Sequence, residues 1–304
     1  MRERATQALL ILVLLALLTL IAMVATRAQG GPLDPPAPPG STSGVRLPGT
    51  PIGPPVSPAT YPIVISAPGH YYLTGNLVVP ADATGIRISA SDVTLDLGGF
   101  TISGGGTGSA AAVTTFASPT RVTIANGIVR GFPGSGVSTI GASYSVIENV
   151  IATQNVTGMR ISSNSVVRGC VASANTDSGI VISGSNSRVE RCIVTDNAFV
   201  GVSLQNGTNL VVERSTIAGN NTVGTSVGGL LLNQADAATI RDNDFYGNNG
   251  RDVFVNSATE YAIFLNNTFE CAQMITGDGV ETFIPINATE PGTNRAHRMT
   301  CVGL

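Results

Sequence analysis

The segments IENVIATQN (147–155), VRGCVASAN (167–175) and VERCIVTDN (189–197) share one pattern that ends in Asn. Two copies that we align as one residue longer, VERSTIAGNN (212–221) and IRDNDFYGNN (240–249), continue it. A period of about 20–30 residues is typical of a solenoid, in which each turn of the chain stacks on the last. The periods here are 20, 22, 24 and 28 residues, counted between Asn155, Asn175, Asn197, Asn221 and Asn249.

A short apolar segment follows each copy, and most of these segments open with glycine: GMRI (158–161), GIVI (179–182), GVSL (201–204) and GLLL (229–232). They are rich in aliphatic residues and are separated by Gly, Asn and Ser, which favours short β-strands joined by turns. No ten-residue helical pattern fits between them. The leucine-rich-repeat frame L-x-x-L-x-L-x-x-N is also absent. We therefore predict parallel strands stacked about 4.8 Å apart.

Such stacking predicts columns of like residues in the core, and a column of asparagines at a turn, where amides hydrogen-bond from coil to coil. The sequence supplies four apolar columns. They are Ile147, Val167, Val189, Val212 and Ile240; Ile151, Val171, Ile193, Ile217 and Phe245; Met159, Ile180, Val202, Leu230 and Val253; and Ile161, Ile182, Leu204, Leu232 and Val255.

The composition fits a solenoid and argues against a nucleic-acid partner. The 304 residues are 43% hydrophobic and only 12% charged, with 36 glycines. All 16 basic residues are Arg, the net charge is −3, and no basic cluster occurs in the body of the chain. Proteins that bind nucleic acid need such a cluster to neutralise phosphates.

The N-terminal residues 1–28 have the pattern of an export segment. Arg2 and Arg4 precede an apolar run over 8–25, and a cleavage site is expected after Ala28. The run is also just long enough to span a bilayer, so a retained anchor is the alternative to a cleaved signal peptide. Both place the body outside the cytoplasm, at the cell surface, in the periplasm or in the medium, with membrane contact only through 8–25.

The rest of the chain divides into three regions. A Pro- and Gly-rich linker is expected over 29–60. A single all-β solenoid of about eight coils, including an N-terminal cap, is expected over 61–270. The period is lost over 271–304, which we expect to cover the open C-terminal edge.

Three patterns carry a resemblance to known proteins. They are PIVISAPGHYYLTGNL (62–77), ASDVTLDLGGFTISG (90–104), and an Asn, two or three residues, then G-[IMV]-x-[IL] in 155–161, 175–182 and 197–204. Here the chain resembles the right-handed parallel β-helix proteins of the pectin-lyase-like superfamily. More narrowly, it is similar to exported, NosD-like proteins built from parallel β-helix repeats. The resemblance covers about 61–270 and implies the fold. It implies no single function, because the fold hosts lyases, hydrolases, epimerases and non-catalytic proteins. A role in periplasmic metal delivery is implied by the NosD likeness alone.

Cys170 and Cys192 occupy the same position in neighbouring coils, 22 residues apart. Their Cα atoms would lie about 4.8 Å apart, which is within the range of a disulfide. A ladder of free thiols and a disulfide are both compatible with this spacing. No C-x-x-C or His spacing suggests zinc, so no bound metal is expected from the cysteines.

One charged column should face outward beside the first apolar column, and the next position adds further charges. The simpler interpretation is a surface ladder of ion pairs. The alternative is a polar groove along the solenoid, in which a polysaccharide lies. The groove residues would be Glu148, Arg168, Glu190, Arg191, Arg214 and Arg241.

The densest acidic spot offers candidate catalytic residues: Asp242 and Asp244, with Glu213 one coil away. Carboxylates two residues apart in a strand share a face at about 6.5–7 Å, and inverting glycosidases hold their pair about 6.5–9.5 Å apart. Such carboxylates would also suit Ca²⁺ as a cofactor. Turn chemistry alone is the alternative explanation of Asp and Asn at this point.

The resemblance argues against the familiar enzymes of the superfamily. For a pectate lyase it would imply an Arg base, a nearby Lys and an acidic calcium cluster, but the chain has no Lys. No His occurs between His70 and His297, so the Gly-His-Gly phrase of polygalacturonases and the Asp-Pro-His motif of epimerases are absent. We therefore expect a non-catalytic glycan-binding or structural protein. The alternative is a polysaccharide lyase or glycoside hydrolase with its site near 213–244.

We predict a disulfide between Cys271 and Cys301, because both lie in the tail and an even number of cysteines in an exported chain favours pairing. By the chain-entropy model this ring would stabilise the fold by about 3–4 kcal/mol. Peptide mapping under non-reducing conditions should recover the two peptides as one linked species. Recovery of both cysteines as free thiols would contradict the pairing.

Overall fold

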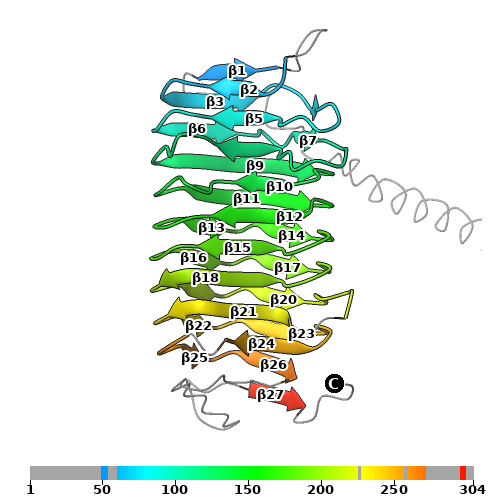
Figure 1. Cartoon of the computed structure of the whole chain (residues 1–304), viewed down its shortest axis with the longest axis vertical. Helices are drawn as coiled ribbons and strands as arrows, with labels where there is room; N and C mark the ends of the chain where they lie inside the picture. Colours follow the sequence, from blue (N-terminus) through cyan, green and yellow to red (C-terminus); the bar gives the residue numbers. More distant parts are fainter. Residues whose placement is uncertain (1–48, 54–59, 225–226, 257–258, 272–294, 299–304) are drawn as a thin grey trace, which may run out of the picture. The chain divides into compact units, whose positions relative to one another are not determined.

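The computed structural model describes residues 49–53, 60–224, 227–256, 259–271 and 295–298. These residues form a solenoid of parallel β-strands and include no helix, so none that could cross a membrane (Figure 1). The expected export segment at 1–28 lies outside the described residues. So does Cys301, and the Cys271–Cys301 disulfide therefore stays a prediction.

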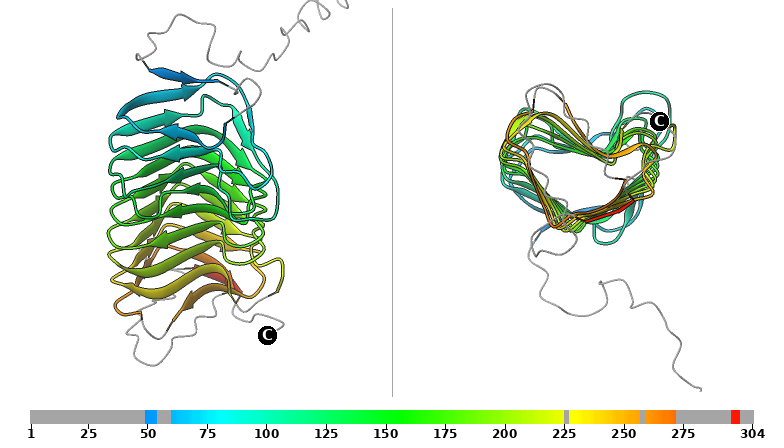
Figure 2. Two further views of the ribbon diagram at one scale, coloured as in Figure 1. Left: turned by 45° about the horizontal axis from the view of Figure 1, so that its top comes forward. Right: turned by 90° about the horizontal axis from the view of Figure 1, so that it is seen from below.

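Each coil contributes strands to three rows, which superpose into a three-sided outline in the view along the solenoid axis (Figure 2). Two long strands, β9 (Val122–Arg130) and β11 (Val146–Thr153), run through both the first and the second row. The first row otherwise contains β1 (Thr50–Ile52), β3 (Gly69–Leu73), β6 (Val93–Asp96), β13 (Val166–Arg168), β16 (Arg188–Glu190), β19 (Val211–Glu213), β22 (Thr239–Arg241) and β25 (Ile263–Leu265).

The second row contains β4 (Leu77–Val78), β7 (Thr101–Ser103), β14 (Val171–Ser173), β17 (Ile193–Thr195), β20 (Thr216–Ala218), β23 (Asp244–Tyr246), β26 (Thr268–Cys271) and β27 (Arg295–Arg298). The third row contains β2 (Ile63–Ile65), β5 (Ile86–Ile88), β8 (Val113–Thr115), β10 (Ser135–Ser138), β12 (Thr157–Ile161), β15 (Ile180–Ser183), β18 (Val202–Thr208), β21 (Val227–Asp236) and β24 (Arg251–Val255). The nine strands of this row give about nine coils, one more than expected. Strand β1 falls within the expected linker and pairs with β3.

Three of the four predicted core columns are confirmed. Side chains alternate across each strand, and the register stacks Ile147 on Val167 in the first row and Met159 on Ile180 in the third. Every member of these three columns is buried. The second predicted column is wrong in its first three members, because Ile151 and Ile193 face outward and are 39% and 49% exposed. The column that fills the core there is Ala152, Ala172, Val194, Ile217 and Phe245.

A corner between the first and second rows causes this shift of phase. The corner residue of each coil has a left-handed backbone, with φ of 53° at Asn149 and 52° at Arg191. The residue after the corner points inward, so the strand that follows starts with an outward side chain. Val150, Cys170 and Cys192 fill this inward position and are buried.

The predicted asparagine column exists, but its last two members are Asn220 and Asn248 rather than Asn221 and Asn249. The first Asn of each Asn-Asn pair carries the stacking, so the last two copies have the same length as the others. In each step the backbone N–H of one Asn donates to the Oδ1 of the next at 3.0–3.2 Å. The Nδ2 group donates to the same Oδ1 and to a backbone carbonyl, as Asn197 Nδ2 does to Ala172 O at 3.0 Å.

A second ladder follows the first corner. Val150 N–H donates to Cys170 Sγ at 3.5 Å, and Cys192 N–H donates to Ser215 Oγ at 3.1 Å. Cys170 and Cys192 are buried free thiols in this structure. The hydrogen bond between the two thiols, together with burial, raises the pKa of Cys192 well above its usual value. This thiol therefore stays protonated at neutral pH.

The asparagine ladder predicts the effect of Asn197→Ala. This change removes the acceptor of the buried Asn175 N–H and should lower the free energy of unfolding by about 2–3 kcal/mol, since an unsatisfied buried donor costs about 1–3 kcal/mol. The matched control is Asn186→Gly, in an exposed amide ladder at a left-handed position, which should cost less than about 1 kcal/mol. Denaturant midpoints give the comparison. Equal losses of unfolding free energy in the two variants would show that the buried ladder stabilises the fold no more than the exposed one.

Candidate ligand-binding face and its arginine cluster

The outward side chains of β13, β16, β19 and β22 form the face on which the sequence placed its candidate groove. The register pairs Glu148 with Arg168, Arg168 with Glu190, Glu190 with Glu213, and Glu213 with Arg241. The predicted outward column is therefore brought together as a stack. Corner residues follow it on one side, and they include Arg191, Arg214 and Asp242, with φ of 52°, 50° and 57°.

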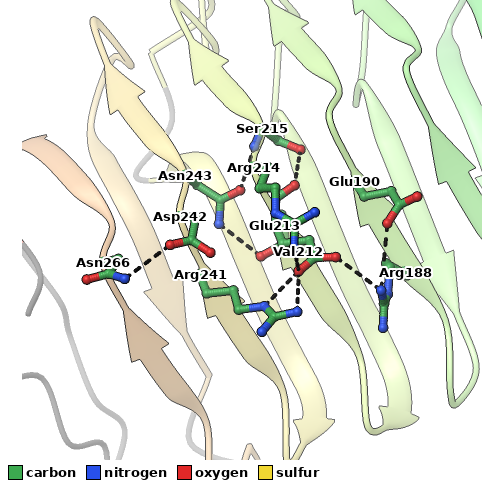
Figure 3. Close-up of polar contacts among 10 residues, drawn as sticks. All are labelled: Arg188, Glu190, Val212, Glu213, Arg214, Ser215, Arg241, Asp242, Asn243 and Asn266. Atoms are coloured by element: carbon green, nitrogen blue, oxygen red, sulfur yellow. Dashed lines mark hydrogen bonds and ion pairs between the residues drawn. The ribbon is translucent and has the colours of Figure 1, made fainter. Parts of the chain in front are cut away.

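Glu213 lies at the centre of this face and is enclosed by three arginines (Figure 3). Arg241 Nε donates to Oε2 at 2.7 Å from the next coil, and Arg188 Nη1 donates to Oε1 at 3.1 Å from the previous one. Arg214 Nη2 lies 3.6 Å from Oε2. As a result, only 1% of the Glu213 side chain is exposed, although it points away from the core.

Two opposing effects set the pKa of Glu213. Burial raises it, whereas the hydrogen bond from Arg241 and the charges of Arg241, Arg188 and Arg214 lower it. The arginines prevail, and the pKa lies below the usual carboxyl value. Glu213 is therefore ionised at neutral pH and holds no proton to donate.

The remaining charges of the face form a less enclosed network. Arg188 Nη1 also lies 3.6 Å from Glu190 Oε2, so it bridges two carboxylates that the register sets side by side. Arg168 Nε donates to Glu148 Oε2 at 2.8 Å. Arg188 was not predicted from the sequence. The one indication of its role was its position two residues before Glu190 in the same strand. Among the described residues, the Arg191 guanidinium has no hydrogen-bond or ion-pair partner.

A hollow of about 350 Å³ lies on this face, over β13, β16 and β19. This volume is at the lower end of the range for small-molecule sites, about 300–1,000 Å³. The lining offers guanidinium, carboxylate and amide groups around two valines. The lining residues are Val166, Arg168, Asn186, Ser187, Arg188, Glu190, Asn209 and Val211.

The predicted spacing of Asp242 and Asp244 placed both residues in one strand. The structure does not, because β22 ends at Arg241 and β23 begins at Asp244. Asp242 is the corner residue after β22, where Asn266 Nδ2 donates to it at 3.2 Å, and Asp244 begins β23. The side chain of Asn243 between them is buried, and both aspartates are exposed. The described residues contain no group of three or more His, Cys, Asp or Glu side chains that could hold a metal ion.

The fold identifies the class of protein. The family model described as "Right handed beta helix region" matches residues 63–217 and 109–269, which is more than half of the chain. The chain therefore belongs to the right-handed β-helix family, in agreement with the resemblance seen in its repeats. No curated protein sequence matches the chain.

Solved structures of several β-helix proteins are similar to this one. Pectate lyase Pel9A has a TM-score of 0.50 at 16% identity, over 76% of this chain and 68% of its own. The A-module of the Azotobacter vinelandii mannuronan C-5 epimerase AlgE4 gives 0.46 at 13%, over 82% and 88%. PfbA, a surface adhesin of Streptococcus pneumoniae, gives 0.43 at 10%, over 74% and 81%. At these identities the likeness extends to the fold alone.

Glu213→Gln tests whether the arginine cluster is held by this carboxylate. Removing one partner of a buried ion pair costs about 3–5 kcal/mol. Because the three arginines remain 39–47% exposed, we expect a loss of about 2–3 kcal/mol at pH 7. Glu148→Gln, which removes a single more exposed ion pair, should cost less than about 1 kcal/mol.

The same variant predicts a pH dependence. The folded-state pKa of Glu213 is lowered, so its contribution is complete above the unfolded-state pKa near 4.5 and is lost as pH falls through the folded-state pKa. The difference in unfolding free energy between wild type and Glu213→Gln should therefore shrink below pH 4.5. Denaturant titrations from pH 7 to pH 3 measure it, and a constant difference would contradict the lowered pKa.

Proposed function

We propose that this chain is an exported β-helix protein that binds a glycan on the face of β13, β16, β19 and β22 without cleaving it. The observation that carries the proposal is the state of Glu213. Its carboxylate is ionised and held by three arginines. A general acid must carry a proton, and a general base must be free to take one. The most central acid of the face therefore suits a fixed recognition surface better than proton transfer.

The hollow supports a sugar as the ligand. Asn186 and Asn209 supply amides, and Arg168, Arg188 and Glu190 supply charged donors and acceptors around one hollow. Sugar hydroxyls both donate and accept hydrogen bonds, so a wall of mixed polarity suits them. Charged groups continue along the stacked coils as Glu148, Arg168, Glu190, Glu213 and Arg241, which suits a polymer. Export is supported by the apolar run over 8–25 that follows Arg2 and Arg4.

The alternative function is a polysaccharide lyase or glycoside hydrolase, because the fold hosts both catalytic and non-catalytic proteins. Asp242 and Asp244 favour this alternative, since both side chains are exposed and Asp242 follows Arg241 of the Glu213 cluster. They would act with Glu213 as the catalytic residues. A calcium-dependent enzyme would draw its oxygen ligands from the same aspartates.

A screen of the purified protein against uronate and neutral polysaccharides separates the two functions. Each polymer is incubated with calcium and, separately, with chelator, while binding, unsaturated products and reducing ends are followed. We expect binding to at least one polymer without products. Ultraviolet-absorbing products lost on chelation would identify a calcium-dependent lyase, and reducing ends without them would identify a hydrolase.

The double variant Asp242→Asn and Asp244→Asn completes the test. Asn tolerates the left-handed backbone of position 242, so the fold should be kept. A binding protein should keep its glycan affinity within about twofold in this variant, which is less than about 0.5 kcal/mol. An enzyme that uses either aspartate should lose most of its turnover.

A further inference from the structure

We infer that Arg191 and Arg214 form a binding site for an oxyanion group of the ligand, a carboxylate or a sulfate. The inference rests on the proposed function, because it names the chemical class of glycan that the same face takes. Three observations support it: the backbone conformation of the two arginines, the groups around them, and a third arginine that binds a carboxylate within the chain.

The two arginines occupy equivalent corner positions in adjacent coils, which sets their Cα atoms about 4.8 Å apart. Both side chains are exposed. Backbone hydrogen bonds fix the corner, since Arg191 N–H donates to Glu213 O at 3.1 Å and Arg214 N–H donates to Arg241 O at 3.2 Å. The guanidinium groups therefore extend from a rigid base with a fixed spacing.

The backbone at both positions is strained for arginine, with φ of 52° and 50°. Such left-handed conformations favour Gly, Asn and Asp and cost other residues free energy. The same corner in other coils carries Asn149, Gly169 and Asp242, which follow that preference. Gly, Asn or Asp would adopt this backbone at a lower free energy, so the presence of arginine indicates a function for its side chain.

The surroundings leave both guanidinium groups with unused donors. Arg191 has no side-chain partner among the described residues. Arg214 approaches only Glu213, at 3.6 Å, and that carboxylate is already bound by Arg188 and Arg241. The next corner residue is Asp242, which is held by Asn266. On the other side of Arg191 is Gly169, which has no side chain to fill the space.

Arg121 shows what a corner arginine does when an acid is present. It lies at another corner, the one that precedes the first row, and it too has a positive φ, of 57°, with Asp92 as the equivalent residue one coil away. The Arg121 guanidinium binds this carboxylate through both Nε and Nη2, the latter at 2.8 Å. Arginine is suited to such two-point binding of planar oxyanions. Arg191 lies between Gly169 and Arg214 and lacks the acid that Arg121 has, while Asp242, the neighbour of Arg214, is held by Asn266. We therefore expect the anion to come from the ligand.

The test compares charged polymers with neutral counterparts: polygalacturonate with its fully methyl-esterified form, and dextran sulfate with dextran. The full chain should bind at least one charged polymer and bind its neutral counterpart far more weakly. The double variant Arg191→Gln and Arg214→Gln should raise the Kd at least tenfold. The double variant Arg121→Gln and Arg130→Gln removes the same charge elsewhere and should change it less than twofold. A preference for polygalacturonate assigns a carboxylate, and a preference for dextran sulfate assigns a sulfate.

Equal binding of a neutral polymer, or equal loss in both double variants, would overturn the inference while leaving glycan binding in place. If no polymer binds, the proposed function fails, and the melting temperature in sodium sulfate against sodium chloride at equal ionic strength decides the site itself. Stabilisation by sulfate that Arg191→Gln and Arg214→Gln abolishes would keep the oxyanion site. Stabilisation that is absent, or that the variant keeps, would overturn it.

Discussion

Inward-pointing backbone N–H groups at the corners are the constraint on which this solenoid depends. Strand pairing satisfies the backbone within each row, but each corner aims a peptide group into an apolar core, where an unpaired donor is costly. Side chains of the next coil supply the acceptors. Asn175, Asn197 and Asn220 do so at one corner, and Cys170, Ser215 and Asn243 do so at another. Each acceptor must lie one coil spacing away, so the ladders fix the register of the whole stack.

A fixed register has consequences on the outer surface, because equivalent positions are then forced to stack. Glu190 and Glu213 become neighbours whether or not their charges are compatible. Arg188 resolves the conflict by binding both carboxylates from within the same strand as Glu190. Arg241 and Arg214 then close around Glu213, which is buried although it belongs to the outer face. The ion-pair ladder suggested by the sequence is therefore present, and two of its members, Arg168 and Glu190, also line the hollow on this face.

The period and the alternation of strands were enough to predict three core columns and the outward charged column. They failed at Ile151 and Ile193 because of the corner, and at the last asparagines because the second Asn of each Asn-Asn pair was aligned in place of the first. A left-handed corner residue resets the alternation, and no apolar pattern marks where that reset falls. The strand spacing assumed for Asp242 and Asp244 failed for the same reason. Arg188 was missed because comparison between coils finds only charges that recur, and its own column otherwise holds Val146, Val166, Val211 and Thr239.

The arginine cluster also links the stability of the face to what the face can do. A carboxylate that supports three guanidinium groups is tied to its ionised form, because protonation would leave those charges without their counter-ion. Catalysis by proton transfer needs the opposite property, a group whose two protonation states are close in free energy at the working pH. Glu213 therefore acts best as the fixed base of a cationic surface. The positive charge is least neutralised at Arg191, whose neighbours at the same corner are Gly169 and Arg214.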